Sequence, residues 1–174
     1  VVSGVIRYDG TTFEHLPTYF GLTSGRGLFE DSRKRLWVAT NDNGVVVLEN
    51  EKARHYTYKD GLPSSSIRIF AEDNKGNIFI GTTAGVCYVD KFGKLSKVSD
   101  PRINDERILK LDSDYNGRVY GQTKKGLIFS IDDCKITNVY SSKELGIETI
   151  TAIMCDPLRP AKLYIGTESH SLYY

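Results

Sequence analysis

Four aspartates recur at nearly constant spacing, and their chemistry decides how the chain is interpreted: Asp31, Asp73, Asp114 and Asp156. Carboxylates at regular intervals could ligate a metal or act in acid–base catalysis. Two of them, however, begin an Asp-x-x-Gly segment, which is typical of a tight reversal in which the aspartate caps its own backbone. These segments lack the further acidic ligands of a calcium loop. We therefore interpret the aspartates as turn residues, and predict no catalytic residue, no metal ligand and no cofactor.

A second group of polar residues departs from this repetition. Arg26 and Arg68 each lie five residues before a turn aspartate, where the other repeats hold Leu109 and Thr151. We expect four further residues near them, in loops that differ between repeats: Tyr19, Asn41, Asp42 and His170. Variable loops on a rigid scaffold are where binding residues concentrate. These six residues are our predicted ligand-binding site, a polar and partly aromatic pocket suited to an oligosaccharide, an acidic saccharide or another small polar ligand.

The two arginines have a structural alternative. Glu30, Glu72 and Asp73 lie close to them in the sequence pattern, and ion pairs with these carboxylates would hold neighbouring units together. In that case the arginines would belong to the framework and not to a site.

The elements that position these residues come from a repeat of about forty residues. An apolar-aromatic pair and then a threonine follow each aspartate, and the threonines Thr40, Thr82, Thr123 and Thr167 are 42, 41 and 44 residues apart. A period near forty, built from short strands and turns, is typical of propeller blades. Such a unit cannot bury its faces alone, so we expect function to belong to the array.

The second repeat shows the expected blade most clearly. It predicts four antiparallel strands, over residues 66–72, 77–82, 86–89 and 94–98, joined by hairpin turns. Its inner strands are almost continuously apolar, which fits a sheet covered on both faces. We expect one aromatic of each second strand to pack between blades: Trp37, Phe79, Tyr120 and Tyr164. The predicted fold class is all-β, with about four repeats of a four-stranded blade.

Residues 1–174 are predicted to form one propeller repeat region. A third strand of one blade occupies 4–9, and repeats follow at roughly 10–48, 49–90, 91–132 and 133–174. Because the pattern begins and ends at a third strand, we expect a fragment of a longer array, a mature or excised piece. Unpaired sheet edges invite pairing with another chain, so a homodimer through open edges is expected.

The second repeat resembles a known family. Gly61-Leu62-Pro63-Ser64, Glu72-Asp73, Gly76 and Ile78-Phe79-Ile80-Gly81-Thr82 are similar to the two-component regulator propeller repeat. The first repeat is also similar, whereas the third has Gly121-Gln122-Thr123 and the fourth replaces the Asp-x-x-Gly turn with residues 156–160. The resemblance implies seven-bladed propellers in the extracytoplasmic, periplasmic sensor part of a bacterial membrane-bound regulator, often a hybrid histidine kinase. It also implies oligosaccharides as the signal in several members.

Composition excludes other classes. The chain has 23 basic and 22 acidic residues, which gives a net charge of +1, and the two signs are interspersed along the sequence. This balance argues against a nucleic-acid-binding surface. No apolar run approaches the ~18 residues that span a bilayer, so this part is not expected to cross a membrane. Cys87, Cys134 and Cys155 have neither metal-ligand nor redox spacing, and we expect buried, inert thiols at Cys87 and Cys155.

The leading functional hypothesis is a non-catalytic module that senses a ligand or couples a signal in a two-component regulator. One alternative is a protein-interaction propeller, which exposes aromatic and charged residues on one rim. Another is a metal-dependent propeller lyase or lactonase. That enzyme needs several polar groups around a central metal, where the inner strands here offer mostly apolar residues.

Overall fold

The computed structural model describes residues 4–41, 43–168 and 172–174. Its strands form successive antiparallel sheets. The N-terminal hairpin contains β1 (Ile6–Tyr8) and β2 (Phe13–His15). The first blade contains β3 (Gly27–Glu30), β4 (Leu36–Ala39), β5 (Val45–Glu49) and β6 (Lys52–Tyr56). The second contains β7 (Ile67–Glu72), β8 (Ile78–Thr82), β9 (Gly85–Val89) and β10 (Leu95–Lys97).

Two further blades follow in the described residues. The third contains β11 (Ile108–Ser113), β12 (Val119–Thr123), β13 (Leu127–Asp132) and β14 (Lys135–Ser141). The fourth contains β15 (Ile150–Cys155), β16 (Leu163–Thr167) and β17 (Leu172–Tyr173). Two 3-10 turns, η1 (Thr18–Phe20) and η2 (Tyr58–Asp60), precede the first two blades. The predicted all-β fold with four-stranded antiparallel blades is confirmed.

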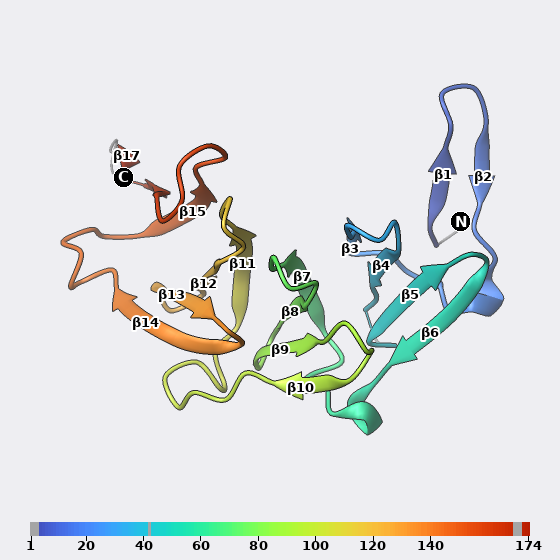
Figure 1. Cartoon of the computed structure of the whole chain (residues 1–174), viewed down its shortest axis with the longest axis horizontal. Coiled ribbons are helices and arrows are strands. Elements are labelled where there is room, and N and C mark those ends of the chain that lie inside the picture. Colours follow the sequence, from blue (N-terminus) through green and yellow to red (C-terminus); the bar gives the residue numbers. More distant parts are fainter. Residues whose placement is uncertain (1–3, 42, 169–171) are drawn as a thin grey trace.

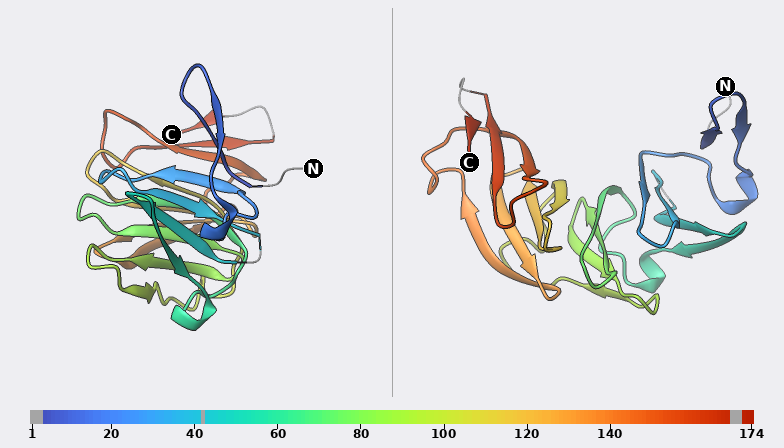
Figure 2. Two further views of the ribbon diagram at one scale, coloured as in Figure 1. Left: turned by 90° about the vertical axis from the view of Figure 1, so that its right-hand side faces the viewer. Right: turned by 45° about the horizontal axis from the view of Figure 1, so that its top comes forward.

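The blades stand side by side in an open arc. The first strands β3, β7, β11 and β15 line its concave side, and the fourth strands β6, β10 and β14 lie on its convex side (Figure 1). The N-terminal hairpin and the fourth blade form opposite arms of the arc (Figure 2). Among the described residues β1 pairs only with β2, and β17 only with β16. The expected homodimer through such edges stays a prediction.

The turn aspartates close the reversal between the first and second strands. The Oδ1 atom of Asp31 accepts hydrogen bonds from the backbone N–H groups of Arg33 and Arg35, both at 3.0 Å. Asp73 and Asp114 hold their own reversals in the same way, with donors two and four residues further on. Their interpretation as turn residues is therefore confirmed.

The recurrent threonine has an equivalent role in the turn between the second and third strands. The hydroxyl of Thr40 donates to the carbonyl of Gly44 at 2.8 Å, and that of Thr82 donates to Gly85 at 2.9 Å. Each hydroxyl also accepts a backbone N–H within its turn. The repeating Asp-to-Thr pattern thus encodes the two hairpins at opposite ends of the second strand.

The hydrophobic core lies in the seams between blades. Trp37 is fully buried and packs in one cluster with Ile67 and Phe70 of the second blade. Phe79 likewise shares a cluster with Ile108 of the third blade. Tyr120 packs against the fourth-blade isoleucines. These contacts confirm the expected position between blades for Trp37, Phe79 and Tyr120.

Tyr164, the equivalent aromatic of the fourth blade, forms hydrogen bonds within its own blade. Its hydroxyl donates to Asp156 at 2.8 Å and accepts from Arg159 at 3.1 Å.

The cysteines follow the expectation for structural thiols. Burial raises the pKa of both Cys87 and Cys155 to about 12, so these two thiols stay protonated at neutral pH.

Candidate functional site

Each blade has two distinct ends. We call the end with the Asp reversals the turn rim, and the opposite end, with the loops around 19–25, 41–43, 59–65, 83–84, 100–107, 124–125, 143–148 and 168, the loop rim. In three blades a backbone N–H of the second-to-third-strand loop donates to a carbonyl just before the first strand. These bonds join Thr83 to Ser66, Lys124 to Arg107 and Glu168 to Thr149. In the first blade the N–H of Asn41 donates to Ser24 Oγ at 3.0 Å. The two loop types therefore share one rim, as expected.

Arg26 and Arg68 lie at the loop-rim ends of neighbouring first strands. Arg26 is exposed and Arg68 is partly buried. A Cβ atom placed on Gly27 would lie 3.3 Å from the carbonyl oxygen of Arg68, so the backbones of β3 and β7 approach closely at this point. The absence of a side chain at Gly27 allows this approach, which brings the two arginines to the same seam.

A β-bulge sets the position of Arg68. In the β7–β8 ladder Ile67 pairs with Thr82 and Ile69 with Gly81, which leaves Arg68 as the extra residue. The third and fourth blades have the same bulge, at Leu109 and Thr151. A bulge removes one residue from the ladder and re-aims its side chain. The position is therefore free to vary between blades, whereas the residue just before it is a buried isoleucine in each of them: Ile67, Ile108 and Ile150.

The structural alternative for the arginines does not hold among the described residues. Glu30 binds Lys34 at 2.8 Å, and Glu72 accepts from both the N–H and the hydroxyl of Ser32. Asp73 holds its own turn. None of these carboxylates pairs with Arg26 or Arg68, and the buried Nε of Arg68 has no hydrogen-bond partner among the described residues.

A third arginine, Arg107, lies near these two and is not among the six predicted site residues. Burial lowers the pKa of Arg68, and the positive charges of Arg107 and Arg26 lower it further, which places all three guanidinium groups in one electrostatic neighbourhood. We call Arg26, Arg68 and Arg107 the arginine cluster. A signal was present in the repeat, because the positions equivalent to Arg107 hold hydroxyl residues: Ser24, Ser66 and Thr149.

The other predicted site residues are dispersed. Asn41 is on the loop rim, where its backbone binds Ser24. Tyr19 is exposed, packs edge-to-face on Phe20, and lines a different pocket of about 610 Å³ between the N-terminal hairpin and the first blade. Asp42 and His170 lie outside the described residues.

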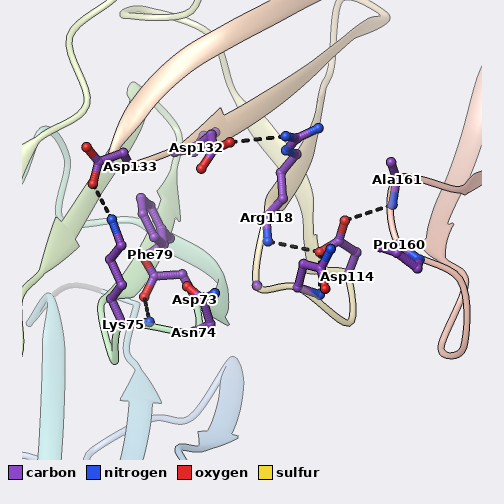
Figure 3. A pocket seen from close by; sticks show the side chains of 13 residues that line it. Asp73, Asn74, Lys75, Phe79, Asp114, Arg118, Asp132, Asp133, Pro160 and Ala161 are labelled. Atoms are coloured by element: carbon purple, nitrogen blue, oxygen red, sulfur yellow. Dashed lines mark hydrogen bonds and ion pairs between the residues drawn. The ribbon is translucent and has the colours of Figure 1, made fainter.

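A second pocket, of about 310 Å³, lies on the turn rim (Figure 3). Lys75 binds Asp133 at 2.6 Å and Arg118 binds Asp132 at 3.1 Å. Asp114 accepts from its own turn and from the backbone of the fourth blade. Both cations of this pocket are therefore paired, and the Lys75–Asp133 pair and the bond to Asp114 each cross a seam between blades. Within the described residues, no group of three or more His, Cys, Asp or Glu side chains could hold a metal.

The fold and these rims define a β-propeller module. Residues 61–84 match the family model of the two component regulator propeller. The chain therefore contains a two-component regulator propeller repeat, at the segment that the sequence resemblance had indicated. The comparison with curated proteins finds no match.

Solved structures share the architecture. The extracellular domain of a putative hybrid two component system of B. thetaiotaomicron, BT4673, is 17% identical with a TM-score of 0.68 over 94% of this chain and 22% of that one. Streptogramin B lyase is 11% identical with a TM-score of 0.73, over 99% and 61%. A catalytically inactive histidine-to-alanine variant of virginiamycin B lyase from Staphylococcus aureus, with quinupristin, is 15% identical with a TM-score of 0.57, over 86% and 54%.

At these identities the likeness establishes the fold alone. The chain spans about a fifth of the first of these proteins and less than two thirds of the two lyases. No helix among the described residues is long and apolar enough to cross a membrane.

Proposed function

We propose that this chain is a non-catalytic sensing and signal-coupling module in the extracytoplasmic, periplasmic part of a membrane-bound bacterial two-component regulator. The observation that carries this proposal is the family match at residues 61–84. The extracellular domains of hybrid two component systems share the fold, which supports it. The loop rim is its binding face, and its ligand is an oligosaccharide or another small polar molecule.

The distribution of carboxylates supports a role without catalysis. Asp31, Asp73 and Asp114 are engaged in their own turns, so they are not free for acid–base work. Toward the concave side, the bulges of the third and fourth blades present Leu109 and Thr151. Leu109 has no acid–base chemistry, and a threonine hydroxyl needs an adjacent base to act as a nucleophile.

A propeller lyase is the second candidate, because two lyases share this fold. The histidine-to-alanine variant of the Staphylococcus aureus protein is catalytically inactive by its description. In this chain the described histidines are His15 on β2 and His55 on β6, both in outer strands. These strands lie away from the concave side, so their position favours the sensing function.

Isothermal titration calorimetry of the chain against a panel of neutral and acidic oligosaccharides tests the proposal. We expect saturable binding of at least one glycan, and no breakdown of that glycan or of a lactone when Mg²⁺ is added. The encoding reading frame is expected to contain a membrane span and a histidine kinase. Metal-dependent turnover of a lactone would instead establish the enzyme, and absence of all glycan binding would refute a carbohydrate ligand.

A further inference from the structure

We propose that the arginine cluster binds the oxyanion of a small ligand, a carboxylate or a sulfate. The inference rests on the proposed function in one respect, because it takes the loop rim as the binding face. It adds the chemical class of the group that is recognised there.

The chain has ten arginines, and all of them lie within the described residues. Six form an ion pair with a carboxylate: Arg7, Arg33, Arg35, Arg102, Arg118 and Arg159. Arg54 stacks over the ring of Tyr56 at 4.7 Å. The three that remain are the members of the arginine cluster. The unpaired guanidinium groups are therefore gathered in one place and not scattered over the surface.

Two carboxylates close to the cluster in sequence have other partners. Glu106, which precedes Arg107, binds Lys125 Nζ at 2.6 Å, and its side chain is only 11% exposed. Glu72 spans the seam to Ser32. These two carboxylates are thus committed to other bonds, and no described carboxylate forms an ion pair with a member of the cluster.

Among the three arginines, Arg68 is expected to gain most from binding an anion. Its Nε is buried without an acceptor, and an unsatisfied buried donor is costly. An oxyanion supplies acceptors that match the planar fork of a guanidinium group, often through two parallel hydrogen bonds. The same anion would relieve the repulsion that Arg26 and Arg107 exert on Arg68.

The extent of the cluster favours a small ligand over a polyanion. Three arginines in a chain of net charge +1 do not form the long basic stripe that follows a nucleic-acid backbone. Beside Arg107 in the sequence, and at the bulge of its own blade, Leu109 is 45% exposed and adds an apolar surface. Three cations next to one apolar side chain suit a compact molecule that combines an acidic group with a ring or chain.

The experiment measures binding of three small probes to the chain by calorimetry at low ionic strength: galacturonate, glucose 6-sulfate and neutral glucose. We expect the two acidic probes to bind more tightly than glucose. Arg68→Met should weaken the acidic probes by roughly ten- to hundredfold, the effect of losing one charge-assisted hydrogen bond. A preference between the acidic probes would identify carboxylate or sulfate as the better group.

Arg33→Met is the matched control, because it removes the same charge from the turn rim. It should leave the affinity for the acidic probes unchanged. Arg26→Met repeats the test with an exposed residue whose loss cannot disturb the core, and should weaken the acidic probes as well. Equal effects of Arg68→Met and Arg33→Met would show that the probes respond to net charge alone, and would overturn the site.

Further outcomes separate this site from the proposed function. If neutral oligosaccharides bind and the cluster variants do not matter, the oxyanion site is wrong while the sensing proposal stands. If acidic monosaccharides bind through the arginines but no oligosaccharide binds, the site stands and an oligosaccharide as the ligand is refuted. A poly-glutamate peptide that outcompetes both acidic probes would contradict a small ligand. If an anion bound only to the Asp42→Asn variant, Asp42 would act as a counter-ion of the cluster. That result would contradict an unpaired cluster.

Discussion

The two rims of the array use charged side chains differently. On the turn rim, Arg35 binds Asp31 at 2.7 Å and Arg159 binds Asp156 at 2.9 Å. On the loop rim, ion pairs such as Lys125–Glu106 also occur, but the arginine cluster is left without a carboxylate partner among the described residues. The overall charge of the chain is almost balanced, and this balance conceals the difference.

The turn-rim carboxylates do more than close their own turns. Three of them accept backbone N–H groups from the next or preceding blade: Glu72 from Ser32, Asp112 from Cys155 and Asp114 from Ala161, at 2.8, 2.8 and 3.0 Å. Acidic groups on this rim therefore join the blades. Position within the blade, and not residue type, therefore separates a structural charge from a candidate binding charge.

The largest effect is expected from Asp31→Asn. The side chain of Asp31 is fully buried and accepts from Arg35 Nε and Trp37 Nε1 at 2.7 and 2.8 Å. The side-chain NH2 group of asparagine would face the N–H groups of Arg35 and Trp37, so that donors would meet donors. Arg35 would then be a buried cation without its partner. Breaking a buried pair in this way costs about 3–5 kcal/mol. The free energy of unfolding, measured by urea denaturation, should fall by this amount.

Asp133→Asn provides the control for this substitution. Asp133 is also on the turn rim, but its pair with Lys75 is exposed. Exposed pairs contribute little, so the urea midpoint should not change measurably. Equal losses in the two variants would mean that burial does not decide the contribution of a turn-rim charge.

The repeat made most of this framework predictable. Asp, Gly and Thr at fixed offsets report local hydrogen bonds, and these are set by a few consecutive residues, so sequence reasoning identifies them. Arg107 was missed although it departs from the hydroxyl residues at the equivalent repeat positions. That departure alone does not tell that Arg107 lies near Arg26 and Arg68, which belong to two other blades. Tyr19 is an example of the opposite error. It lies in a loop that varies between repeats, but this variation does not indicate which pocket its side chain lines.

A smaller and pH-dependent effect is expected for Asp156→Asn. The backbone N–H of Leu158, with the Tyr164 hydroxyl and Arg159, lowers the pKa of Asp156 to about 2. The ordinary pKa is about 3.9, so the carboxylate stabilises the folded state above about pH 4, and this stabilisation is lost as pH falls toward about pH 2. Urea denaturation of both proteins should show a gap at neutral pH that closes in acid. Parallel pH profiles would contradict this account.

Apart from the Asp133→Asn control, the smallest effect is expected from Arg68→Met, and its sign should be opposite. Methionine keeps an apolar stem of similar length but removes a charge that Arg26 and Arg107 repel and a buried donor without an acceptor. The free energy of unfolding should stay constant or rise, by about 0.5 kcal/mol or less, and any gain should shrink in high salt because salt screens the repulsion. Arg35→Met is the matched substitution on the turn rim, and it should destabilise the fold because Asp31 loses its partner. If the free energy of unfolding falls equally in both variants, the arginines of the two rims are equally structural. Arg68 would then not be an unpaired cation that is available to a ligand.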